Sequence, residues 1–155
     1  MTRTLYCLDT SSLLNSWTKH YRVSSFGPLW KRIEEEIENG KLISPPLVLT
    51  ELGRQHDDLY MWAKARPKLF VPWSDELQLR QKEIVNAHPR LVDEKKGRSM
   101  CDPWVIALAQ IRRCPVVTEE DPSSDTRPRI PDVCRMMGIT WMRMADLIDE
   151  IGLNL

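Results

Sequence analysis

The chain has 155 residues, with 22 basic and 22 acidic side chains, so its formal net charge is zero. This length suffices for one domain, residues 1–155, with a full hydrophobic core, and no linker or repeat indicates a second domain. The chain lacks the apolar stretch of a signal peptide and any apolar window of about 18 residues, which argues against a membrane span. We therefore expect a cytoplasmic protein with no membrane partner.

The first predicted element is the short apolar run Leu5–Leu8. Such a run is typical of a buried central strand in a parallel sheet. Asp9 follows at the carboxyl end of this strand, where ligands bind in open α/β sheets. Residues 10–12 are Thr-Ser-Ser and can cap the helix that follows. The alternative is that Asp9 only caps this helix.

A helix over residues 26–39 and a short strand over residues 41–44 come next. Ser44 is then expected to cap a helix that begins with two prolines. Within that helix Glu51 falls close to the buried face, where a carboxylate is costly unless a positive charge compensates. The alternative is that Glu51 points to solvent beside Arg54.

Two more helices are predicted over residues 57–64 and 74–88. Between them the apolar residues 69–71 form either an edge strand or an extended crossover. A helix over residues 99–109 carries Asp102 in its first turn, where the helix dipole stabilises a negative side chain by about 0.3–1 kcal/mol. From there Asp102 could also serve as a ligand aimed at the crevice above the strands.

The buried strand predicted over residues 114–118 is followed by three acids, Glu119, Glu120 and Asp121. A run of acids is otherwise a solvated turn. The remaining predicted elements are a helix over residues 130–138, a strand over residues 139–142 and a helix over residues 146–151. Asp132 either caps the first of these helices or joins the site.

This alternation of strands and helices predicts the fold class. It indicates an α/β protein, a three-layer α/β/α sandwich with a mostly parallel central sheet. The four cysteines stand far apart, with no CxxC pair and no nearby histidine, so they are expected to be reduced core thiols rather than zinc ligands or disulfides. They are Cys7, Cys101, Cys114 and Cys134.

Four acids in separate segments, Asp9, Glu51, Asp102 and Glu120, suggest chemistry if the fold brings them together. Four adjacent carboxylates cannot all stay ionised without a cation. Oxygen ligands without His or Cys select Mg²⁺ or Mn²⁺, and such a centre suits hydrolysis of a phosphodiester bond. With four acids set aside, 22 basic and 18 acidic residues remain, so the neutral charge does not exclude a nucleic-acid substrate.

In four stretches the chain resembles PIN-domain nucleases, the family of the VapC-like toxins. An added helix over residues 57–64, the basic loop before Asp102 and residues 127–134 further resemble a less characterised subgroup of toxin-like proteins. The four stretches carry the family resemblance. Each stretch alone is a weak signal, but the four occur in the order and spacing of that family. They are Leu8-Asp9-Thr10-Ser11-Ser12-Leu13, Leu49-Thr50-Glu51-Leu52, Asp102-Pro103-Trp104-Val105-Ile106-Ala107-Leu108-Ala109 and Val116-Val117-Thr118-Glu119-Glu120.

The resemblance implies roles for the acids. Asp9, Glu51 and Asp102 would be catalytic metal ligands, and the fourth catalytic ligand falls on Glu120. The family more often has Asp at this fourth position, which leaves Asp121 as an alternative ligand.

Other positions follow from the same resemblance. Ser11 stands where the family has a small hydroxyl that supports the first Asp. Lys96 and Arg98, in the basic loop before Asp102, are expected to contact substrate phosphate, or else are simply solvated.

The resemblance also implies a function. We expect a Mg²⁺- or Mn²⁺-dependent endoribonuclease, the toxin of a toxin–antitoxin pair, with RNA as its substrate and a protein antitoxin as its partner. Whether it forms a homodimer stays open. The alternatives are a catalytically silent interaction module with the PIN fold and a DNA-directed nuclease of the same fold.

Six tryptophans are many for this length. Trp30, Trp104 and Trp141 fit apolar periodic positions and are expected in the core. Trp62 and Trp73 border polar segments, where they are either partly buried or available to stack on bases or contact a partner.

Overall fold

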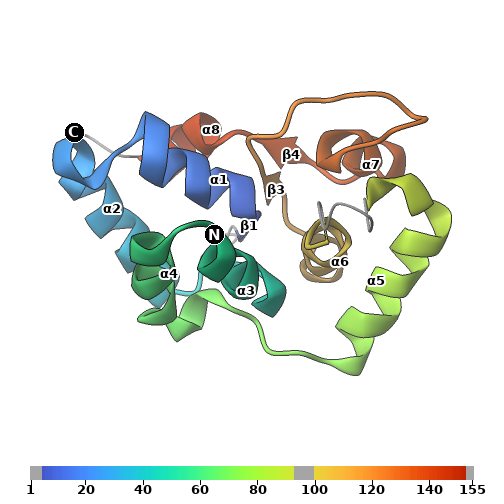
Figure 1. Ribbon diagram of the computed structural model, residues 1–155, viewed down its shortest axis with the longest axis horizontal. Coiled ribbons are helices and arrows are strands. Elements are labelled where there is room, and N and C mark those ends of the chain that lie inside the picture. The colour runs from blue at the N-terminus through green and yellow to red at the C-terminus, as the bar shows by residue number, and fades with distance from the viewer. Residues whose placement is uncertain (1–4, 93–99, 153–155) are drawn as a thin grey trace.

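The computed structural model describes residues 5–92 and 100–152 (Figure 1). Its centre is a sheet in the order β2-β1-β3-β4, and every pair of neighbouring strands is parallel. The strands are β1 (Tyr6–Leu8), β2 (Leu42–Ile43), β3 (Val116–Val117) and β4 (Trp141–Met142).

Helices surround this sheet in the part of the chain that the structure describes. They are α1 (Thr10–Asn15), η1 (Ser16–His20), α2 (Val23–Glu38), α3 (Pro46–Gln55), α4 (Asp57–Lys64), η2 (Pro67–Leu69), α5 (Asp75–Ala87), η3 (Pro89–Leu91), α6 (Asp102–Arg112), α7 (Ile130–Met137) and α8 (Met144–Ile151). The predicted α/β class with a mostly parallel sheet is confirmed. None of the described helices is long and apolar enough to cross a membrane.

The two central strands form because their residues are apolar and fully enclosed. Cys7 and Leu8 of β1, and Val116 and Val117 of β3, are each 0% exposed. In register, Cys7 pairs with Val116 and Leu8 with Val117. A strand buried on both faces is expected for a parallel sheet that has helices on each side.

Helices cover the sheet from two sides. On one side α2 and α8 are joined where Arg32 Nη2 donates to the carbonyl of Ile151, and Tyr6 Oη of β1 donates to Glu150 Oε2. On the other side α6 packs on β1 and β3, and α7 packs on α6. These layers are the predicted sandwich.

The strand order creates a topological switch point between β1 and β3. From β1 the chain crosses to β2 on one side, and later returns to β3 on the other side of β1. The connections leaving the carboxyl ends of β1 and β3 therefore run in opposite directions, which opens a crevice there. Asp9 and Thr118 are the residues that directly follow these two strands.

Ser44 was expected to cap α3, and this expectation is wrong. The N-cap residue is Pro45, which offers no side-chain acceptor. Ser44 Oγ instead donates a 2.7 Å hydrogen bond to the carbonyl of Leu8, at the end of β1. The hydroxyl therefore joins neighbouring strand ends, because the carbonyl of a buried strand needs a donor.

Other element bounds also differ from the predictions. Helix α2 begins at Val23 rather than residue 26, with a kink at Phe26. Leu69 ends η2, and the extended residue Phe70 makes a single parallel bridge to Ser44, so residues 69–71 form no full edge strand. The four cysteines are buried and reduced, as predicted.

The tryptophans divide between core and surface. Trp30 is buried, and Trp104 and Trp141 are partly buried against the core. Trp62 packs edge to face on Trp30, 5.2 Å between ring centroids, so it belongs to an internal aromatic cluster. Trp73 is 52% exposed and contacts Trp104.

Candidate functional site

Asp9 is held at the end of β1 by donors from α1 and from the residue that follows β3. The Ser12 N–H donates to Asp9 Oδ1 at 2.7 Å, which makes Asp9 the N-cap of α1. The hydroxyls of Ser11 and Thr118 donate to Asp9 Oδ2 at 2.8 and 2.5 Å. Asp9 therefore caps its helix, and its carboxyl group is also fixed beside the strand end of β3.

Burial makes the charge on Asp9 unfavourable. Loss of solvation raises the pKa of Asp9 from 3.8 to about 7, and the nearby charge of Glu120 adds to the rise. The hydrogen bonds from Thr118, Ser12 and Ser11 act in the opposite direction without cancelling it. A buried acid with an elevated pKa at a switch point is a candidate functional group.

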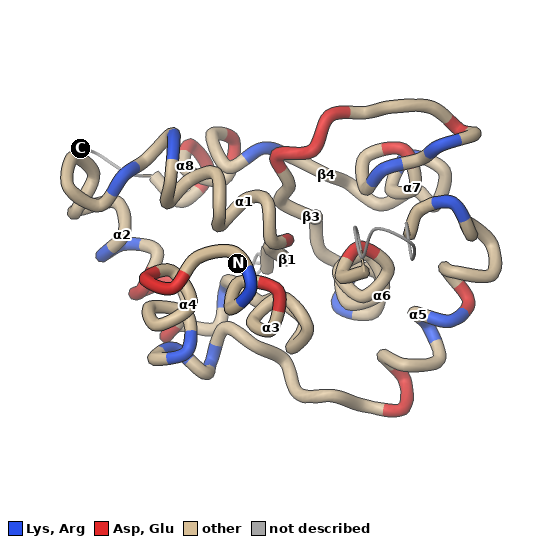
Figure 2. Tube along the Cα trace, in the orientation of Figure 1, with Lys and Arg blue, Asp and Glu red and all other residues tan. Residues whose placement is uncertain are grey.

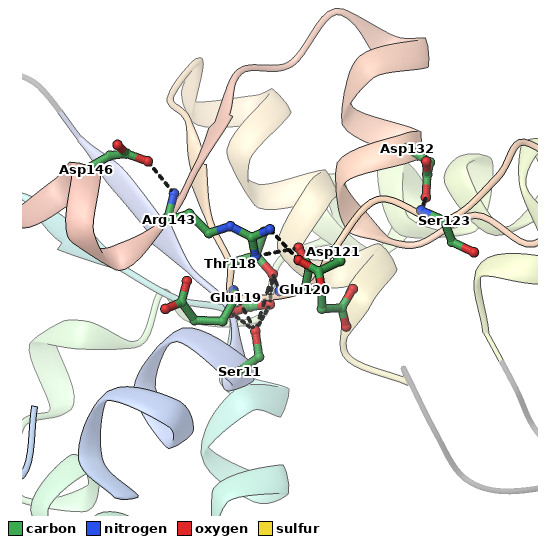
Figure 3. Close-up of polar contacts among 10 residues, drawn as sticks. Ser11, Thr118, Glu119, Glu120, Asp121, Ser123, Asp132, Arg143 and Asp146 are labelled. Atoms are coloured by element: carbon green, nitrogen blue, oxygen red, sulfur yellow. Dashed lines mark hydrogen bonds and ion pairs between the residues drawn. The ribbon is translucent and has the colours of Figure 1, made fainter. Parts of the chain in front are cut away.

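The three acids after β3 point in different directions (Figure 3). Glu119 lies near Tyr21, and burial together with the Glu119 charge raises the pKa of Tyr21. Asp121 has an 81% exposed side chain and pairs with Arg143 at 2.6 Å. Of the three, Glu120 faces the other predicted ligands.

Glu120 is the centre of this arrangement. Burial raises its pKa, and the charge of Glu51 raises it further, while a hydrogen bond with the Asp102 carboxyl lowers it. Its Oε1 accepts a 3.2 Å hydrogen bond from the Ile130 N–H at the start of α7. Arg129 lies near enough to lower the Glu120 pKa as well.

Glu51 and Asp102 approach from α3 and α6. Asp102 is buried in the first turn of α6. Burial, together with the nearby Glu51 and Asp102 carboxylates, raises the pKa of the Cys101 thiol. Both carboxylates therefore lie near Cys101, the residue that precedes α6, and a ligand role for Glu51 stays a prediction.

Asp9, Glu51, Asp102 and Glu120 thus lie near enough to be linked through electrostatic effects on neighbouring groups, and we name these four residues the acid group. Figure 2 shows acidic segments at the end of β1, on α3 and on α6 around the centre of the molecule. Burial and the charge of Glu51 favour a protonated carboxyl group on Glu120. A proton here balances charge that a metal ion could balance instead.

The donor chemistry of the acid group fits a hard divalent cation. All four ligands would be carboxylate oxygens, and no Lys or Arg of the described chain forms an ion pair with Asp9, Glu51 or Glu120. Within residues 5–92 and 100–152, however, no three acid, His or Cys side chains already stand close enough to hold one ion. Water molecules would therefore have to complete the coordination, which Mg²⁺ commonly requires.

Several residues around the acid group were not assigned by the sequence. Thr118 binds Asp9 directly, and its place immediately after a buried strand was the available signal. Arg143, which binds the turn after β3, offered no local signal. Asp132 Oδ2 accepts the N–H groups of Ser123 and Arg129, so it caps α7. The predicted phosphate contacts, Lys96 and Arg98, lie outside the described residues.

The chain belongs to a family described as a domain of unknown function, DUF4411, which matches residues 6–155. No curated protein matches it. Among solved structures it is similar to a chain of VapBC-1 from nontypeable Haemophilus influenzae, with a TM-score of 0.56 and 15% sequence identity. The match covers 92% of this chain and 99% of that chain, and it shows a shared fold.

Proposed function

We propose that this protein is a metal-dependent endoribonuclease and the toxin of a toxin–antitoxin pair. The observation that carries the proposal is the acid group, in which Asp9 and Glu120 meet at the switch point between β1 and β3. The similarity of the fold to a chain of VapBC-1 supports the same class. Nuclease chemistry follows from the acids, whereas the choice of RNA follows from the resemblance to PIN-domain toxins.

Asp9, Glu51, Asp102 and Glu120 would hold Mg²⁺ or Mn²⁺. When bound, such an ion supplies an activated water and neutralises charge on the scissile phosphate. The chain's own part is to keep the ligands in place. Ser11 and Thr118 orient Asp9.

The partner of this proposal is a protein antitoxin. The similar chain comes from a structure whose title names VapBC-1, and we extend that pairing to this protein as part of the proposal. Affinity purification of the chain expressed together with its neighbouring gene tests it. A small protein that copurifies in a fixed ratio and suppresses cleavage is expected.

The central test is cleavage of matched RNA and DNA oligonucleotides by the purified chain with Mn²⁺. We expect RNA cleavage that EDTA stops, with 5′-phosphate products, because attack by water expels the 3′ oxygen. Products with 2′,3′-cyclic phosphate would instead indicate attack by the ribose hydroxyl and would contradict a metal-dependent hydrolase. Cleavage of DNA alone would assign DNA as the substrate in place of RNA. Absence of both cleavage and Mn²⁺ binding would favour a catalytically silent interaction module.

A matched pair of variants decides which acid is the fourth ligand. Glu120→Gln is expected to weaken Mn²⁺ binding at least about tenfold, because it removes a buried charged ligand. Asp121→Asn should change binding less than about twofold, since its exposed ion pair contributes little. Isothermal titration calorimetry with Mn²⁺ measures both, and the reverse order of effects would assign the role to Asp121.

A further inference from the structure

We propose that Arg143 is a positioning residue that holds the turn after β3, so that Glu120 enters the acid group and Asp121 stays outside it. The part of this inference that concerns metal rests on the proposed function. The part that concerns the turn stands on the hydrogen bonds that Arg143 makes.

One guanidinium group binds two successive residues of the turn. Arg143 Nη1 donates to the backbone carbonyl of Glu120 at 2.8 Å, and Arg143 Nη2 donates to Asp121 Oδ1 at 2.6 Å (Figure 3). The two nitrogen atoms of a planar fork fix both distances and direction. The backbone of Glu120 is thus held while the Asp121 side chain is turned away.

Arg143 is itself anchored. It directly follows β4, whose Met142 carbonyl accepts the N–H of Thr118, so the ends of β3 and β4 lie side by side. The Arg143 N–H donates to Asp146 Oδ2 in the first turn of α8. Its guanidinium also lies 5.2 Å from the centre of the Trp141 ring. Because the Arg143 side chain is restrained at its base and along its length, its guanidinium group can hold the turn in a fixed position.

The opposite side of the same turn is bound to the Asp9 supports. The Glu119 N–H donates to Ser11 Oγ at 3.0 Å, and the Glu120 N–H donates to Thr118 Oγ1 at 3.1 Å. These are the hydroxyls that bind Asp9. Arg143 therefore binds one side of the turn, while the Ser11 and Thr118 hydroxyls, which also orient Asp9, bind the other side.

Arg143 also acts through charge. Asp121 is one residue away from a ligand and would add a further carboxylate near the acid group if it turned inward. Its ion pair with Arg143 offsets that charge on the outside. The Arg143 guanidinium therefore determines that Glu120, and not the adjacent Asp121, faces the acid group. The sequence of the turn alone does not determine this.

The experiment compares Arg143→Ala and Arg143→Lys with Arg135→Ala, a control that removes an Arg–Asp ion pair elsewhere on the surface. In the metal-free protein, hydrogen exchange of the Glu120 amide should be about tenfold faster in Arg143→Ala. For Mn²⁺, the dissociation constant should rise about tenfold, the lower end of the effect of residues that orient metal ligands. Arg143→Lys should fall between, because an ammonium lacks the planar fork. Arg135→Ala should change neither quantity.

A double-variant cycle separates positioning from general structure. If Arg143 acts through Glu120, Arg143→Ala should alter the Mn²⁺ dissociation constant less than about twofold in the Glu120→Gln background. An equal effect in both backgrounds, or unchanged exchange and affinity in Arg143→Ala, overturns the proposal. Should the wild-type chain bind no Mn²⁺, the proposed function fails, and amide exchange alone decides whether Arg143 holds the turn.

Discussion

Asp9→Asn is expected to reduce metal-dependent RNA cleavage at least about 100-fold, while the metal-free variant melts at a higher temperature than the wild-type protein. Cleavage is lost because a neutral amide replaces a carboxylate that the proposed cation needs. Even substitution of a residue that only orients a metal ligand typically lowers metal affinity or activity about 10–100-fold. The gain follows because burial and the charge of Glu120 oppose ionisation of Asp9. Activity and stability should therefore move in opposite directions.

The stability gain has a limited size. A shift of one pKa unit corresponds to about 1.36 kcal/mol, but Asn also disturbs the hydroxyl donors from Ser11 and Thr118. We expect a net gain of about 1–2 kcal/mol, or roughly 3–6 °C in melting temperature at pH 8. Asn keeps the acceptor for the Ser12 N–H, so the helix cap should survive.

Circular dichroism and a fluorescent RNA assay measure the two quantities. Asp57→Asn is the matched control, because Asp57 is an exposed acid in the first turn of α4, outside the acid group. It should leave cleavage unchanged and slightly lower stability through the helix dipole. An Asp9→Asn protein that cleaves RNA normally would refute the assignment of Asp9.

The second large effect is a dependence of stability on pH that a divalent cation reverses. The folded-state pKa of Asp9 is raised, so between pH 3.8 and about 7 the folded chain retains a proton that the unfolded chain has released. In that window the unfolded state binds fewer protons, and the free energy of unfolding falls as pH rises. This contribution is fully present below pH 3.8 and is lost as pH rises through about 7. Glu120, whose pKa is also raised, adds in the same direction.

Mn²⁺ or Mg²⁺ should bind the ionised acids and so compete with protons. At a concentration 100 times the dissociation constant, a ligand stabilises the folded state by about 2.7 kcal/mol, or roughly 8 °C for a chain of this size. We expect that increase at pH 8 and a much smaller one at pH 5. Thermal melts at both pH values, with and without Mn²⁺ and in the absence of RNA, measure this stabilisation.

The comparison with Asp9→Asn isolates the acid group from the other titrating residues. The variant should lose most of the difference between the two pH values and most of the stabilisation by Mn²⁺. Calorimetry in buffers of different ionisation enthalpy should also detect protons released on binding by the wild-type chain near pH 6. Equal stabilisation by Mn²⁺ at pH 5 and pH 8 would show that the ion binds elsewhere.

Much of the fold could be predicted because local patterns determine it. Leu8 and Val117 lie in short apolar runs that suit only buried strands, and Gly138 ends α7 with the positive φ that glycine favours. Boundaries were less predictable where neighbours compete for a group. Ser44 has the composition of a helix cap, but the unpaired carbonyl of Leu8 takes its hydroxyl.

The candidate site was predictable in part. Asp9 and Asp102 stand next to recognisable structural junctions, so their positions could be read along the chain. Whether they act as ligands stays a prediction, as do the metal, the RNA substrate and the single-domain organisation. The roles of Thr118 and Arg143 depend on contacts between distant segments, which no local pattern contains.

By itself, the amino-acid sequence determined which segments become strands and helices, and that an acid follows each of the two central strands. These are consequences of side-chain hydrophobicity and backbone preference acting over a few residues. Only the tertiary structure decided which of three consecutive acids turns inward. That choice depends on Arg143, which lies 22 residues from Asp121 in sequence and reaches the turn because β3 and β4 pair in the sheet.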